Sequence, residues 1–288
     1  MDSAKILERT PKKSKLVRKD VSILVPSIRP ENLERFYASA EKACKRHSFE
    51  LIIPSPYLIP ESLMKKGNVK FLHTYANPTI SFQMASLLCD SEFIYNTTDD
   101  GLIQEDAIDI AIDMFRHVNN EKLMINMVYD EAVLDRETLE LLSPNHKHFS
   151  PAYWFAWSHG DLRLPGIKQD WKICMHFFMK VDYFFELGGF DCEYEYSNHA
   201  LHDLAFRVQQ DNGVILELPK VAFYCSHGHS DHAPVESAQL GPDIRRFSSI
   251  YTDPEAASKR IHLNFNNWKG RDPIWKRRFT ENDLKIRK

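Results

Sequence analysis

The sequence contains no long apolar run and no cysteine pattern typical of a disulfide-rich or zinc-binding domain. Its apolar stretches, such as residues 51–53, are far too short to span a bilayer. The first 20 residues are rich in lysine and lack the apolar segment of a secretory signal. The five cysteines are odd in number and have no Cys-x-x-Cys spacing: Cys44, Cys89, Cys174, Cys192 and Cys225. These absences argue against a transmembrane segment and a disulfide framework, and they predict a reducing, cytoplasmic environment.

What the sequence does contain is the composition of a globular protein. Its 288 residues are 43% hydrophobic and 27% charged, enough to bury one large core or two small ones. The net charge of -3 is unevenly divided: residues 1–20 carry seven Lys/Arg against three Asp/Glu and residues 259–288 carry ten against three, so the rest carries -14. Two basic ends on an acidic body are either solvated tails or contacts for a phosphate-rich partner, such as nucleic acid or an anionic membrane surface.

Apolar runs alternate with amphipathic segments through the first 120 residues. The runs predict strands at residues 21–26, 49–54, 69–73 and 92–96. The intervening spacing predicts helices from residue 33, at 81–88 and at 104–118. Further along, we expect a strand at 175–180, a helix at 203–210 and two strand-like runs within 214–224. This alternation favours an α/β fold with a mostly parallel central sheet flanked by helices, in which ligands bind at the carboxyl ends of the strands.

Two adjacent carboxylates follow the fourth predicted strand, in the segment Thr98-Asp99-Asp100-Gly101. Adjacent carboxylates repel each other unless a cation lies between or beyond them, and hard cations such as Mg²⁺ or Mn²⁺ prefer oxygen ligands. The same letters also suit a plain Asp-Asp-Gly turn. The first strand ends nearby in Val25-Pro26-Ser27, so Ser27 and Arg29 are expected at the same sheet edge as the two aspartates.

The order of the later segments is more specific than the aspartate pair. Gly188-Gly189-Phe190-Asp191 is followed by His202-Asp203-Leu204 and then by Arg207. Together with the first strand and the aspartate pair, this order resembles glycosyltransferase family 2 on the GT-A fold, over roughly residues 21–230. We therefore expect a basic leader, a GT-A catalytic domain with a nucleotide-binding half and an acceptor half, and a basic C-terminal extension. The expected bounds are 1–20, 21–232 (divided into 21–101 and 102–232) and 233–288.

The resemblance implies roles for individual residues. It places five of them around a nucleotide-sugar donor: Pro26, Ser27, Arg29, Asp99 and Gly189. It makes Asp100 a ligand of Mn²⁺ or Mg²⁺, assisted by His227 and His229 after the last core strand, and it makes Asp203 the general base. Simpler readings exist, because an aspartate in the first turn of a helix interacts well with the helix dipole and a glycine pair can serve only an unusual turn.

Two positions depart from the family pattern. His202 stands where the family has Glu, and the second strand ends in Ile53-Pro54-Ser55, where family members usually carry an Asp that reads a uracil ring. A further segment, His227-Gly228-His229-Ser230-Asp231-His232, is similar to the zinc-binding His-x-His-x-Asp-His motif of metallo-β-lactamase-like hydrolases. That family needs more ligands downstream, and His262 is the only later histidine.

The sequence therefore predicts an inverting, metal-dependent glycosyltransferase that moves a sugar from a nucleotide-sugar donor to a hydroxyl acceptor. The acceptor is open: a glycan, a lipid-linked sugar, a protein or a modified nucleic acid. The alternatives are a metallo-β-lactamase-like hydrolase and a catalytically silent GT-A-like domain that binds a nucleotide or polyanion through its basic ends. A phosphate-bearing acceptor is slightly favoured by the basic C-terminal residues Lys269, Arg271, Lys276, Arg277 and Arg278.

Overall fold

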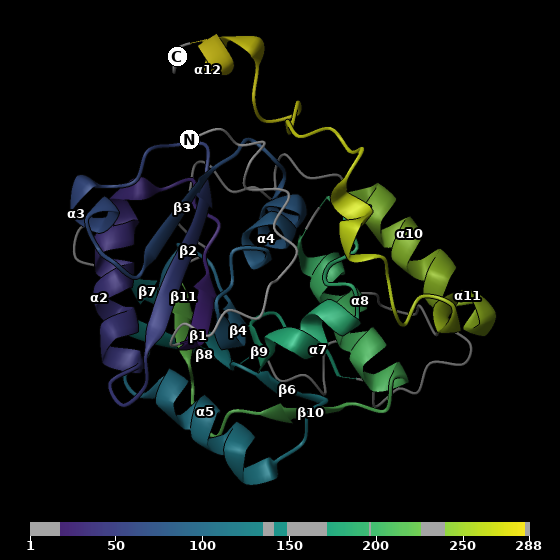
Figure 1. Cartoon of the computed structure of the whole chain (residues 1–288), viewed down its shortest axis with the longest axis horizontal. Coiled ribbons are helices and arrows are strands. Elements are labelled where there is room, and N and C mark those ends of the chain that lie inside the picture. Colours follow the sequence, from purple (N-terminus) through teal and green to yellow (C-terminus); the bar gives the residue numbers. More distant parts are fainter. Residues whose placement is uncertain (1–17, 135–140, 149–171, 196, 226–239, 286–288) are drawn as a thin grey trace.

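Seven strands form the central sheet of the molecule (Figure 1). The computed structural model describes residues 18–134, 141–148, 172–195, 197–225 and 240–285. The strand order is β10-β6-β9-β4-β1-β2-β3, and β9 alone runs antiparallel to its neighbours. The sheet is therefore mostly parallel, as the alternation predicts. The strand bounds are β1 Lys19–Leu24, β2 Phe49–Ser55, β3 Val69–His73, β4 Ser91–Asn96, β6 Leu123–Asn126, β9 Phe177–Lys180 and β10 Val214–Glu217.

Continuous apolar runs produce the central strands because both faces of the sheet are covered. All seven residues of β2 are buried, as are the last four of β1. Leu51 and Ile53 pack into one apolar cluster, whereas Ile52 between them packs into the other. The predicted strands at 49–54, 69–73 and 92–96 match β2, β3 and β4 to within one residue at each end. The first strand begins earlier than predicted, at Lys19 inside the expected leader.

Helices cover both faces of the sheet (Figure 1). One apolar cluster joins the sheet to α2 and α5 through Phe36 and Phe115, and the other joins it to α4, α7, α8 and α10, with Phe82 and Phe206 among its members. The spacing that predicts helices in the first half is thus confirmed, with α4 beginning three residues before its predicted start. The bounds are η1 Pro30–Asn32, α2 Leu33–Ala43, α3 Glu61–Met64, α4 Pro78–Ser86, α5 Ala107–Val118, α7 Val181–Glu186, α8 Ser197–Gln210 and α10 Leu240–Tyr251.

A smaller four-stranded sheet continues from the carboxyl end of β4, in the order β5-β11-β7-β8. Its strands are β5 Gly101–Ile103, β7 Tyr129–Leu134, β8 Leu141–His148 and β11 Phe223–Cys225. β11 runs antiparallel to β5, and Cys225 lies opposite Gly101. A Cβ atom on Gly101 would lie 2.0 Å from the backbone oxygen of Tyr224, so a glycine is required here for β11 to approach β5. Gly101 therefore opens a strand directly after the aspartate pair.

Parts of the described C-terminal segment pack against the core, whereas α12 at its end is exposed. Phe247 and Tyr251 of α10 are buried in the cluster that includes α8. The chain then returns to the sheet, where Ile274 forms a parallel bridge with Tyr75 just beyond β3 (Figure 1, yellow). The remaining elements are α11 Pro254–Ser258, η3 Phe265–Trp268 and α12 Glu281–Lys285. Of all the helices in the described ranges, none has the length and apolarity needed to cross a lipid bilayer.

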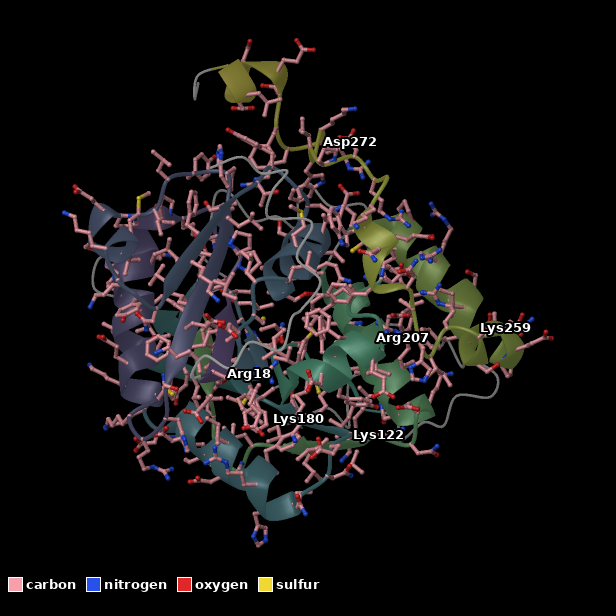
Figure 2. All side chains as sticks on the ribbon, viewed as in Figure 1. Arg18, Lys122, Lys180, Arg207, Lys259 and Asp272 are labelled. Atoms are coloured by element: carbon pink, nitrogen blue, oxygen red, sulfur yellow. The ribbon has the colours of Figure 1, made fainter. Side chains whose placement is uncertain are left out.

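Arginines of this C-terminal segment are paired with carboxylates of residues 191–195. The three pairs are Arg260 with Asp191 at 2.5 Å, Arg271 with Glu193 at 3.2 Å, and Arg277 with Glu195. Figure 2 shows Lys259 and Asp272 at the outer surface, and each forms an ion pair within the segment. Much of the basic charge at this end of the chain is therefore compensated inside the molecule.

Gly188 and Gly189 form a tight turn after α7, with φ values of 83° and 67°. The C-terminal segment closes over this turn, since the Leu263 N–H donates to the Leu187 oxygen at 3.0 Å. A Cβ atom on Gly188 would lie 2.0 Å from the backbone oxygen of Leu263. Both the positive φ and the close approach therefore require glycine at position 188.

We expect Gly188→Ala to lower the free energy of unfolding by about 3 kcal/mol or more, because a positive φ and an overpacked contact each cost roughly 1–2 kcal/mol. Gly270→Ala is the matched control, since Gly270 has the same φ of 83° with no atom within 4 Å of an added Cβ. It should cost only about 1 kcal/mol. Urea unfolding of both variants measures the difference. Equal losses would contradict the constraint from Leu263.

Candidate functional site

The carboxylate of Asp99 holds the loop that follows β1. Its Oδ2 accepts hydrogen bonds from Ser27 Oγ at 2.8 Å, from the Ile28 N–H at 3.1 Å and from the Arg29 N–H at 3.0 Å. Its Oδ1 forms an ion pair with Nη1 of Arg29. Asn32 Nδ2 donates to the backbone oxygen of Asp99 at 3.0 Å. One buried aspartate therefore joins the carboxyl ends of β1 and β4.

These contacts direct Asp99 and Arg29 toward each other. The Arg29 side chain is 13% exposed and that of Asp99 is 4% exposed. Burial raises the pKa of the Asp99 carboxyl, against the opposing effect of the Arg29 guanidinium. Ser27 is buried as well, and Pro26 is half-buried beside it. The structure thus brings together four of the residues expected around a donor, and it engages two of them, Asp99 and Arg29, mainly with each other.

Asp100 is placed differently from its neighbour. It is half-buried, and its Oδ1 accepts a hydrogen bond from Thr98 Oγ1 at 2.5 Å. In the part of the chain that the structure describes, no residue distant in sequence donates a hydrogen bond to this carboxylate. Among the described residues, its Oδ2 accepts no hydrogen bond, and the carboxylate interacts electrostatically with Arg29.

The strand that precedes His227 ends beside the aspartate pair. β11 ends at Cys225, opposite Gly101, so the chain leaves the small sheet next to Asp100. His227 and His229, with the rest of the segment 227–232, lie outside the described residues. Among the residues that are described, no group of three or more His, Cys, Asp or Glu is placed to hold a metal ion.

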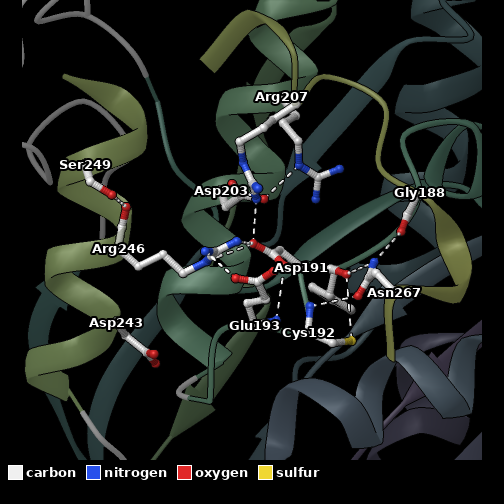
Figure 3. A network of polar contacts seen from close by, with 12 residues as sticks. Gly188, Asp191, Cys192, Glu193, Asp203, Arg207, Asp243, Arg246, Ser249 and Asn267 are labelled. Atoms are coloured by element: carbon white, nitrogen blue, oxygen red, sulfur yellow. Dashed lines mark hydrogen bonds and ion pairs between the residues drawn. The ribbon is translucent and has the colours of Figure 1, made fainter. Parts of the chain in front are cut away.

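Asp203 lies at the centre of a buried ionic network (Figure 3). It pairs with Arg207 one helical turn further along α8, and neither side chain has any exposed surface. Arg207 Nε donates to Asp203 Oδ2 at 2.7 Å, while Nη1 and Nη2 donate to the backbone oxygens of Leu187 at 2.6 Å and Gly189 at 2.5 Å. Tyr251 donates to Asp203 Oδ1 at 2.8 Å. Since both carboxylate oxygens are engaged in the interior, this geometry favours a positioning role for Asp203 over the general base expected from the sequence.

Asp191 extends this network to the C-terminal segment. Its Oδ2 accepts hydrogen bonds from Arg246 Nη2 at 2.8 Å and from Arg260 Nη2 at 2.5 Å. Burial raises the pKa of Asp191, but the guanidinium groups of Arg260 and Arg246 outweigh this effect and hold the pKa below its usual value. Arg260 also lies 3.6 Å from Asp203 Oδ1. The Gly-Gly-Phe-Asp and Asp-Leu-x-x-Arg segments are therefore two halves of one network.

Gly189, which the sequence places near a donor sugar, is covered by Gln83 of α4. A Cβ atom on Gly189 would lie 2.4 Å from Gln83 Oε1. Gln83 Nε2 donates to the backbone oxygens of Gly188 at 3.2 Å and Phe265 at 2.9 Å, and its Oε1 accepts from the Phe190 N–H at 2.8 Å. The glycine pair allows the turn to pack closely against Gln83, and the role of Gly189 near a donor sugar stays a prediction.

Sequence reasoning missed the residues that complete these contacts: Asn32, Gln83, Tyr251 and Arg260. Gln83 is 107 residues from Phe190, and Tyr251 is 48 residues from Asp203, so no local pattern connects them. The one available signal is Gln83 itself, a lone long polar side chain in a helix of small and apolar residues that is almost entirely buried. A buried amide needs hydrogen-bond partners, which indicates a tertiary contact without identifying it.

Comparison with solved structures gives a likeness in fold. The structure resembles residues 1–349 of TarS, a glycosyltransferase of S. aureus, with a TM-score of 0.51 at 14% sequence identity. The match covers 86% of this chain and 71% of that one. No protein-family model matches the sequence, and no curated protein matches it. The likeness is one of fold: a mostly parallel central sheet flanked by helices.

We expect Asp203→Asn to lower the free energy of unfolding by about 3–5 kcal/mol, because Arg207 would remain buried without a charged partner. Asp113→Asn is the control, since Asp113 is 49% exposed in its 2.6 Å pair with Arg46 and should cost less than about 1 kcal/mol. Denaturant unfolding compares the two. A stable Asp203→Asn protein that has lost catalysis would instead support the general-base role.

The lowered pKa of Asp191 also predicts a pH dependence. Its ionised form stabilises the fold above the unfolded-state pKa of about 3.9, and this contribution is lost as the pH falls through the folded-state value. Asp191→Asn should therefore be less stable than the wild type at neutral pH and lose less stability on acidification below about pH 4. Unfolding curves from neutral pH downward test this. Parallel curves for the two proteins would contradict it.

Proposed function

We propose that this protein is an inverting glycosyltransferase that uses a nucleotide-sugar donor together with Mn²⁺ or Mg²⁺. The observation that carries the proposal is the division of roles between two adjacent aspartates at the carboxyl edge of the sheet. Asp99 fixes the loop after β1, and Asp100 keeps an oxygen for a ligand. The likeness of the fold to TarS supports the same reading at a coarser level.

The residues present suit a hard divalent cation. Asp100 offers a carboxylate oxygen, and β11 leads toward His227 and His229, which we propose as further ligands. When bound, the cation would offset the charge of the departing diphosphate. The Asp99 clamp holds Ser27 and Arg29 in place before any donor arrives, so the donor meets a preformed edge.

Attack by the acceptor hydroxyl from the face opposite the diphosphate would invert the anomeric centre. The family resemblance proposes Asp203 as the base for that hydroxyl, whereas the buried pair with Arg207 supports a positioning role. We adopt the positioning role, in which Asp203 and Arg207 hold α8 against the turn at 187–189 and the proton of the attacking hydroxyl passes to water as the bond to the diphosphate breaks. The stability of Asp203→Asn distinguishes these roles.

The donor site is tested by thermal unfolding with a panel of nucleoside diphosphates and sugar nucleotides, each with and without Mn²⁺. A ligand that binds only the folded state raises the melting temperature. We expect one nucleotide series to do so only with Mn²⁺, and we expect Asp100→Ala to abolish this shift while unfolding at the wild-type temperature. Asp113→Ala is the matched control, because Asp113 is an exposed acid on α5 outside the site.

The remaining outcomes separate the alternatives. A metal-dependent shift that persists in Asp100→Ala would overturn the assignment of Asp100. Donor binding without release of nucleoside diphosphate in the presence of any acceptor would favour a silent nucleotide-binding domain. Bound zinc without any nucleotide effect would favour hydrolase chemistry at residues 227–232.

A further inference from the structure

A pocket of about 380 Å³ lies between the C-terminal segment and the body of the protein. Its size falls within the usual range of about 300–1,000 Å³ for small-molecule sites. One wall is formed by residues 271–277, and the facing wall by the start of α4, the loop at 192–195 and the start of α10. None of the residues assigned to the donor site lines this pocket.

The pocket lies at the same edge of the sheet as the donor site. Asn77, which lines it, caps α4 by accepting a hydrogen bond from the Ile80 N–H at 2.9 Å, and α4 begins shortly after β3 ends. The other wall is tied to that edge, because the Trp275 N–H donates to the Tyr75 oxygen at 2.8 Å. A second ligand held here therefore shares the carboxyl edge with a donor at β1 and β4.

The charges of the pocket nearly cancel. Its lining includes four acids, Glu193, Glu195, Asp243 and Asp272, and three bases, Arg271, Lys276 and Arg277, which sum to -1. Every base is already paired with one of these acids, Arg271 with Glu193 at 3.2 Å, Lys276 with Asp272 at 2.5 Å and Arg277 with Glu195. A phosphate would have to displace a carboxylate and then lie beside it, so the pocket disfavours an anionic ligand.

The uncharged part of the lining is mixed: Ile80, Pro242 and Ile274 are apolar, and Asn77, Cys192 and Trp275 complete the walls. Such a mixture suits a ligand whose groups both donate and accept hydrogen bonds around an apolar frame. Hydroxyl groups can donate to Glu193 and Asp272 and accept from Arg271, and C–H faces can pack on the two isoleucines. Uncharged sugars have this chemistry, and polyanions do not.

We propose that this pocket binds the acceptor of the reaction, and that the acceptor end is an uncharged carbohydrate rather than a phosphate-bearing group. That the bound sugar is the acceptor rests on the glycosyltransferase function proposed above. That the pocket binds a neutral sugar does not depend on that function. The C-terminal segment then has a defined task, since Ile274 and Arg271 complete a pocket that the rest of the chain leaves open.

The test is isothermal titration of the full chain, without donor or metal, using the neutral disaccharides maltose, cellobiose and chitobiose. Glycerol 3-phosphate and inorganic phosphate serve as anionic probes. We expect at least one disaccharide to bind with a Kd in the millimolar range or below, and neither anion to bind or compete. Failure of all three disaccharides, or tighter binding of an anion, would overturn the proposal.

Two matched pairs of variants locate the binding. Arg271→Ala and Glu193→Ala remove an ion pair in the pocket, and Lys259→Ala and Glu255→Ala remove one on α11, where the two side chains are 70% and 76% exposed. The pocket variants should raise the disaccharide Kd by about tenfold or more and the α11 variants should leave it unchanged. Wild-type affinity in the pocket variants would place the sugar elsewhere. Disaccharide binding without any nucleotide effect would support the sugar pocket and reject the transferase function. A nucleotide effect without disaccharide binding would support the transferase function and reject the sugar pocket.

Discussion

The buried ion pair between Asp203 and Arg207 is the interaction on which the packing of α8, the turn at 187–189 and the C-terminal segment depends. Arg207 has no exposed side-chain surface: its Nε donates to Asp203 within α8, and its Nη1 and Nη2 fix α8 to the turn at Leu187 and Gly189. Charges so far from water are tolerated only when their hydrogen-bonding groups are satisfied. The glycine turn, Tyr251 and Arg260 are arranged around this requirement.

At the carboxyl edge of the sheet, Asp99 is likewise a buried charge whose hydrogen-bonding groups are satisfied. Two neighbouring carboxylates repel each other, and in this fold the carboxylate of Asp99 is bound by the loop that follows β1. The cost of burying Asp99 is offset by Ser27, by two backbone N–H groups and by Arg29. Asp100, by contrast, is half-buried and accepts a hydrogen bond from its near neighbour Thr98.

How far the sequence predicts this structure depends on the range of the interactions. Strands such as β2 and β3 are recognised because burial on both faces leaves a local apolar run. The site is only partly predictable. Sequence motifs single out Asp99, Asp100 and Asp203, but they do not identify the residues that contact these carboxylates. Arg207 lies one turn from Asp203 and could have been paired with it from its i,i+4 spacing. Gln83, Tyr251 and Arg260 could not, because their contacts arise from tertiary packing across many residues.

The C-terminal closure has a consequence for the way the protein is made. Asp191 and Asp203 are synthesised long before Arg260, and the turn at Gly188 is long exposed before Leu263 arrives to cover it. Because translation runs from the N-terminus, the ribosome delivers Arg260 only after Asp191 and Asp203 have been made. Until then Asp191 and Asp203 lack one of their arginine partners, so this network should be completed only after residues 260–263 have left the ribosome.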